Sequence, residues 1–96
     1  MKFERMVDMT KPWDGYCINQ QAYRIKLYGP LENGKVMIRL NNSKILVDSA
    51  YMDSNRIEIT DGNKRVRFCR AERHWVGGQC PRSIRGKWAI DGWTTY

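Results

Sequence analysis

The residues best suited to chemistry in this sequence are the arginines and lysines of one segment, which runs from Lys64 to Lys87. The segment holds eight basic residues and one acidic residue, Glu72, so its balance equals the net charge of +7 for the whole chain. Six of the eight are Arg, whose guanidinium binds phosphate or carboxylate through two parallel hydrogen bonds. The rest of the sequence balances nine basic against nine acidic residues. A binding surface is therefore sought in this segment.

This charge distribution favours a polyanion as the partner, and nucleic acid is the polyanion that it favours most. Trp75 and Trp88 lie among the basic residues, and an exposed ring could stack on a base while the cations contact phosphates. Two plainer interpretations stay open: the cations form a solvated face, and the tryptophans belong to the core. The candidate binding residues are Lys64, Arg65, Arg67, Arg70, Arg73, Trp75, Arg82, Arg85 and Lys87.

An acidic protein surface is the alternative partner, because Arg and Trp are also favoured at protein interfaces. The size and the arginine content are similar to those of small accessory or inhibitor proteins of phages and mobile elements. That is a resemblance of type, and no motif carries it. Such a protein would use the same Arg and Trp residues to block a host nucleic-acid-processing or defence protein. For neither partner do we expect enzyme activity or a cofactor.

The histidine and the cysteines supply the other groups with possible chemistry. His74 paired with Glu72 could act in general acid–base catalysis, as in small basic ribonuclease toxins, but residues 1–21 leave little room for the N-terminal helices of such toxins. A zinc site is a further alternative, although the Cys-x2-Cys pair that begins a zinc knuckle is missing. We therefore predict no catalytic residue and no metal ligand. The ligand set considered for zinc is Cys17, Cys69, His74 and Cys80.

Short strands joined by tight turns are the elements that would position these residues, because Ile, Val and aromatic residues dominate the apolar set. Residues 1–21 form an irregular N-terminal segment in which a short helix could fit near 16–22. Residues 92–96 form a tail that is either the end of an edge strand or a contact arm. The expected strands are 23–28, 35–40, 44–48, 56–60, 64–69, 73–76 and 86–91, with a polar loop over 49–55.

The hairpin that carries the first arginines can be predicted in register. A two-residue loop at 62–63 is the choice that sets the apolar residues of 56–60 against those of 64–69, and Gly at its first position suits a type II′ turn. Val66 and Phe68 then point to the core. Arg65, Arg67 and Cys69 share the opposite face of the strand.

The fold class expected from these elements is mainly β, in one small domain that covers 1–96. Residues 22–91 would form an antiparallel meander, curled into a small SH3-like or OB-like barrel or a strongly bent sheet. The sequence has no apolar run of 18 residues, its first residues lack the apolar core of a signal peptide, and its cysteines number three, so we expect a cytoplasmic protein without membrane contact. An exposed edge strand could pair two copies of the chain.

Overall fold

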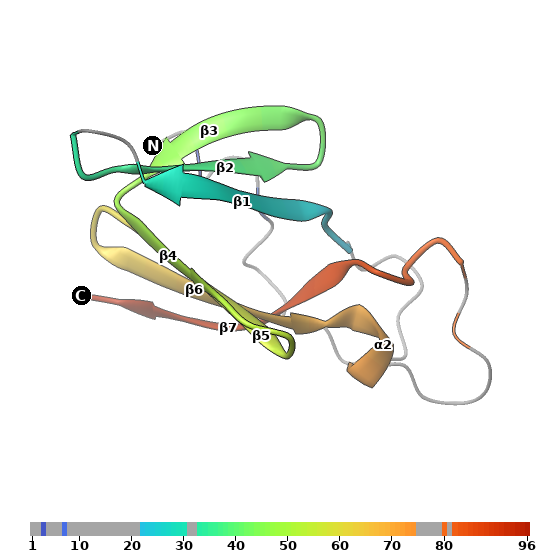
Figure 1. The fold of residues 1–96 in the computed structure, drawn as a ribbon. Coiled ribbons are helices and arrows are strands. Elements are labelled where there is room, and N and C mark those ends of the chain that lie inside the picture. Colours follow the sequence, from blue (N-terminus) through green and yellow to red (C-terminus); the bar gives the residue numbers. More distant parts are fainter. Residues whose placement is uncertain (1–2, 4–6, 8–21, 31–32, 75–79, 81) are drawn as a thin grey trace.

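The described part of the chain, residues 3, 7, 22–30, 33–74, 80 and 82–96 of a computed structural model, forms two antiparallel sheets and one short helix (Figure 1). This confirms the mainly β class. The strands are β1 (Ile25–Pro30), β2 (Val36–Leu40), β3 (Ser43–Val47), β4 (Ser49–Met52), β5 (Arg56–Asp61), β6 (Lys64–Arg70) and β7 (Trp88–Thr95), and the helix is α2 (Ala71–His74).

Each sheet is a meander in which strands that follow one another in the sequence also lie side by side. The first sheet has the order β1-β2-β3, and the second has the order β4-β5-β6-β7. Tyr23 and Trp88 exchange two backbone hydrogen bonds, of 2.7 and 2.8 Å, and so tie the start of the first sheet to the start of β7. Among the described strands we find no closed barrel, because the sheet order ends at β1 and β3 in one sheet and at β4 and β7 in the other.

A corner at Asp48 explains why the chain makes two sheets. On β3 the buried residues are Ile45 and Val47, whereas on β4 the residues packed against the core are Ala50 and Met52. The inward-facing positions thus change from odd to even across Asp48, which a continuous strand does not allow. The chain turns at this residue, and the inner faces of the two sheets then face one another across the core.

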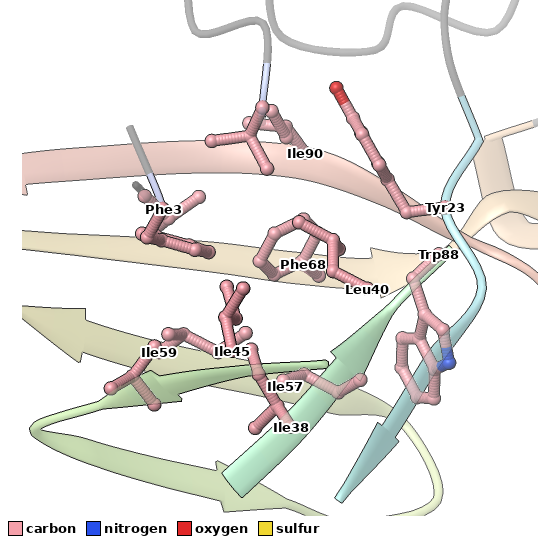
Figure 2. Close-up of a cluster of buried hydrophobic side chains, with 13 residues drawn as sticks. Phe3, Tyr23, Ile38, Leu40, Ile45, Ile57, Ile59, Phe68, Trp88 and Ile90 are labelled. Atoms are coloured by element: carbon pink, nitrogen blue, oxygen red, sulfur yellow. The ribbon is translucent and has the colours of Figure 1, made fainter. Parts of the chain in front are cut away.

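The core lies between the two sheets and draws on both of them. Figure 2 shows Phe3 among strand side chains, so the N-terminal segment contributes to the core as well. Tyr23 and Phe68 meet edge to face, with their ring centroids 5.9 Å apart, an arrangement that aromatic pairs prefer. The buried residues of this cluster are Phe3, Val7, Tyr23, Ile38, Leu40, Ile45, Val47, Ile57, Ile59, Val66, Phe68, Trp88 and Ile90.

The hairpin of β5 and β6 has the register expected from the sequence. Ile59 lies opposite Val66, and the loop of 62–63 connects the strands. Gly62 has a φ of 63°, and Asn63 is not among the residues with positive φ, as a type II′ turn requires. The apolar pattern therefore decided the register, and it leaves Arg65 and Arg67 on the outer face.

Two sequence-based predictions are corrected by the structure. The polar loop expected at 49–55 begins with strand β4, because Ala50 and Met52 pack against the core. The strand expected at 73–76 is wrong at its start, where α2 brings Ala71 into a small buried cluster with Ile84 and Ala89. Residues 75 and 76 lie outside the described part.

The strand expected at 86–91 is longer than predicted. β7 continues through Gly92–Thr95, four of the five residues in the expected tail, and pairs with β6 as far as Thr95 opposite Lys64. The helix considered near 16–22 lies outside the described residues, apart from Ala22. Within the part of the chain that is described, we find no helix long and apolar enough to cross a membrane.

Candidate functional site

Arg65 lies on the outer face of the four-stranded sheet, turned away from the core. It is exposed, and its Nε donates a hydrogen bond of 3.2 Å to Oγ1 of Thr60 on β5. Its guanidinium carbon lies 5.5 Å from the ring centroid of Tyr96, a residue that is 66% exposed. A cation and a flat ring thus lie together at this surface, a combination that suits a phosphate beside a base.

Arg67 shares this face but lies flat on the neighbouring strand. Its Nη1 donates a 3.2 Å hydrogen bond to Oγ1 of Thr94, and its Nη2 lies 2.5 Å from the place where a Cβ on Gly92 would be. Gly92 is therefore the residue that lets the guanidinium approach β7. Arg67 is half-buried and its guanidinium is already oriented by these contacts. Binding a phosphate would therefore cost less side-chain entropy than it would at a freely moving arginine.

Arg70 lies at the other end of β6 and Arg73 lies just beyond it, and both contact the turn between β4 and β5. The Arg70 guanidinium lies 4.6 Å from the centroid of the Trp88 ring, and its Nε donates to the carbonyl oxygen of Ser54 at 2.9 Å. Arg73 on α2 donates from Nη2 to Oδ1 of Asn55, also at 2.9 Å. These contacts give both arginines a structural role. Trp88 is buried, so it offers no ring to a base.

The turn that these arginines contact is built around Asp53. The backbone N–H groups of Asn55 and Arg56 donate to its Oδ1 at 2.7 and 2.8 Å, and these bonds hold the pKa of Asp53 below its usual value. The Tyr51 hydroxyl donates to Oδ2 at 2.9 Å, which raises the pKa of Tyr51. Asp53 thus remains ionised and orders the turn near Arg70 and Arg73.

The last three candidate cations lie in the segment that leads to β7. Arg82 and Arg85 are exposed, and Lys87 is half-buried. Arg85 donates from Nε to the carbonyl oxygen of Cys80 at 3.0 Å. Glu72, the acidic residue within 64–87, accepts a hydrogen bond from the N–H of Gly86, so this carboxylate orders the 82–87 turns.

By their contacts, the cations of the basic segment therefore divide into separate groups. Arg65 and Arg67 occupy the outer sheet face, Arg70 and Arg73 contact the β4–β5 turn, and the last three cations belong to the loop before β7. Lys64 lies in the hairpin, opposite Asp61. Trp75 lies outside the described residues, so its role in binding stays a prediction.

Sequence reasoning missed two residues of the outer face, Tyr51 and Arg56. Tyr51 is 47% exposed, and the Arg56 guanidinium carbon lies 5.3 Å from its ring centroid. Tyr51 and Glu58 are directly opposite on β4 and β5, and Glu58 is opposite Arg67. The alternation of β4 was the available signal, but its polar residues led to the prediction of a loop. We call the set Tyr51, Arg56, Arg65, Arg67 and Tyr96 the Arg-Tyr face.

Neither the catalytic nor the zinc alternative gains support from the described residues. Glu72 is engaged at Gly86, and His74 is described in its backbone only. Burial raises the pKa of the Cys69 thiol to about 11, and its Sγ contacts the carbonyl oxygen of Ala89 at 3.8 Å. Cys17 lies outside the described part. No group of three or more His, Cys, Asp or Glu side chains within that part could hold a metal ion.

Comparison of the chain with protein-family models, with curated proteins and with solved structures found no match.

Proposed function

We propose that this protein binds nucleic acid through its phosphates, with little sequence specificity, and that the Arg-Tyr face is the contact surface. The observation that carries the proposal is the pair Arg65 and Arg67 on the outer face of β6, beside the exposed ring of Tyr96. Phosphate contacts release counterions and so supply affinity that does not depend on sequence. Exposed tyrosine rings add stacking, which every base accepts.

The sheet gives this surface a rigidity that a flexible basic tail lacks. Arg65 is held by Thr60, and Arg67 is held by Thr94, so both guanidinium groups are oriented before a ligand arrives. Their contacts use one N–H of each fork and leave other donors for phosphate oxygens. Specific base readout is not part of the proposal, because the set consists of guanidinium groups and phenol rings on an open face.

The experiment compares the wild type with the double variant Arg65→Gln, Arg67→Gln, using a single-stranded 20-mer at several salt concentrations between 50 and 200 mM. Each lost phosphate contact should lower the slope of log K against log salt by about 0.7, which at 50 mM corresponds to roughly eightfold in affinity. The double variant should therefore bind roughly 60-fold more weakly. Urea unfolding checks that the variant is folded.

Glu58→Gln is the control with the opposite sign. Glu58 lies opposite Arg67 on the same outer face, so removing its negative charge should strengthen oligonucleotide binding. Undetectable binding of the wild type at micromolar concentration and 50 mM salt would refute the proposed function. An acidic protein partner, as an inhibitor or adaptor would have, would then be the hypothesis to test by pull-down.

A further inference from the structure

A second set of cations lies on the outer face of the three-stranded sheet, far from the basic segment in the sequence. Lys26 on β1 is directly opposite Arg39 on β2, and Arg39 is directly opposite Lys44 on β3. All three side chains are exposed, because Leu27, Ile38 and Ile45 take the inward positions of the same strands. We call Lys26, Arg39 and Lys44 the cation row.

This arrangement is unfavourable for the free protein. Like charges directly opposite one another on neighbouring strands destabilise a sheet, and the row contains two such pairs, Lys26–Arg39 and Arg39–Lys44. Among the described residues no carboxylate forms an ion pair with any member of the row. Between residues 22 and 47 the sequence has a single acidic residue, Glu32, which lies outside the described part. Within the part of the chain that the structure describes, the repulsion in the row is thus not relieved by a carboxylate.

Tyr28 holds two members of the row in place. The Nζ atoms of Lys26 and Lys44 both lie 5.4 Å from the centroid of its ring, within the range of a cation–π contact. The ring therefore offsets part of the repulsion between the two ammonium groups and orients both toward the same surface. Tyr28 is a positioning residue for this row.

Next to the row is a polar hollow of about 210 Å³. Arg24, Lys26 and Arg39 contribute to its lining, together with Ile25 and with Asn41 and Asn42 in the β2–β3 turn. Asn41 has a positive φ of 55° in that turn, and its Oδ1 accepts a hydrogen bond of 3.1 Å from the backbone N–H of Arg24. The hollow thus combines cations with amide donors, which is the chemistry that binds a phosphate oxygen.

We propose that the cation row and the adjoining hollow form a second nucleic-acid surface, which binds the phosphodiester backbone. Neighbouring strands are about 4.8 Å apart, so the row presents three cations over about 10 Å, and a phosphodiester chain supplies a full negative charge at every nucleotide. The Arg39 guanidinium at the centre matches a phosphate with its fork. This inference goes beyond the proposed function, since the row shares no residue with the Arg-Tyr face and lies on the other sheet.

One substitution in the row should raise the stability of the protein and weaken its binding to nucleic acid. Arg39→Gln removes both like-charge pairs, so it should raise the midpoint of thermal unfolding by about 2–5 °C at low salt. The same variant should bind a single-stranded 20-mer about eightfold more weakly at 50 mM salt. A residue with a merely structural role would not combine higher stability with weaker binding.

Lys35→Gln is the matched control, because it removes the same charge from the residue that directly precedes β2. Lys35 is exposed and forms an ion pair with Asp48 at 3.3 Å, outside the row. It should change oligonucleotide affinity less than twofold and should not raise the unfolding midpoint. Lys26→Gln serves as the second variant of the row and should weaken binding in the same way as Arg39→Gln.

The outcomes separate the two surfaces. When Arg39→Gln is added to the double variant Arg65→Gln, Arg67→Gln, it should still weaken binding about eightfold. If the double variant binds like the wild type and Arg39→Gln binds more weakly, the Arg-Tyr face is wrong and the second surface stands. Equal effects of Arg39→Gln and Lys35→Gln would overturn the second surface, because net charge alone would then be acting. Poly-glutamate that binds as tightly as an oligonucleotide of equal charge would also overturn it, in favour of an acidic protein.

Discussion

Replacing Gly92 by Ala tests how firmly the structure holds Arg67 on its face. The new Cβ would lie 2.5 Å from Nη2 of Arg67, and the far end of the Arg side chain would have to lift by about 1 Å to reach ordinary contact. The 3.2 Å hydrogen bond from Arg67 to Thr94 would then be lost. Because Gly92 does not have a positive φ, Ala itself fits the backbone.

The expected change in the free energy of unfolding is the sum of two opposed contributions. Loss of a hydrogen bond made by a charged group at a partly buried position costs about 1–1.5 kcal/mol net. Ala in place of Gly lowers the entropy of the unfolded chain, which stabilises the fold by about 0.4–1 kcal/mol. In the wild-type background Gly92→Ala should therefore destabilise by about 0.5 kcal/mol. In an Arg67→Ala background it should stabilise by about 0.4–1 kcal/mol, since nothing is displaced there.

A double-mutant cycle measured by urea unfolding checks this change of sign. The coupling between the two positions should be about 1–1.5 kcal/mol, well above the scatter for independent sites. Gly29→Ala is the matched control, because a Cβ at Gly29 would meet no atom within 4 Å, and its stabilisation should be the same in both backgrounds. A coupling below about 0.3 kcal/mol would show that the Arg67 guanidinium does not lie against Gly92.

Three further predictions concern the core, the one buried carboxyl among the described residues, and the exposed carboxyl of Asp48. Phe68→Ala should destabilise by about 3–5 kcal/mol, a large part of the stability of a small domain, whereas Tyr96→Ala at an exposed position should change the urea midpoint little. Equal effects of the two substitutions would contradict the assignment of Phe68 to the core. Burial, with the nearby charge of Asp48 as a second cause, raises the pKa of Asp61 above 3.8, so the fold loses stability as the pH rises from 3.8 through the pKa of the folded state. Asp61→Asn should therefore stabilise the protein at pH 7 and not below pH 3.8, and urea midpoints at pH 3, 5 and 7 would expose an effect of the wrong sign. Asp48→Asn should destabilise the protein at pH 7, because the N–H of Gly62 and the ammonium of Lys35 hold the pKa of Asp48 below 3.8 and stabilise its ionised form.

Local features of the sequence were sufficient to predict the β5–β6 hairpin. Its strands alternate apolar and polar residues, and Gly62 supplies the positive φ of the connecting turn. Both signals act between residues that are close in the sequence. The same reasoning failed for β4, because its polar residues favoured a loop although the alternation of the segment places Ala50 and Met52 on one side, toward the core.

The sequence by itself determined the mainly β class, the register of one hairpin and the placement of Arg65 and Arg67 on the face opposite Val66 and Phe68, because strand alternation depends only on the order of residues. Only the tertiary structure decided which charges lie together. It divided the basic segment among a sheet face, a turn and a loop, and it aligned Lys26, Arg39 and Lys44 across three strands. A charge count along the chain combines those three with acidic residues elsewhere in the sequence. Strand pairing, in contrast, sets the three cations side by side.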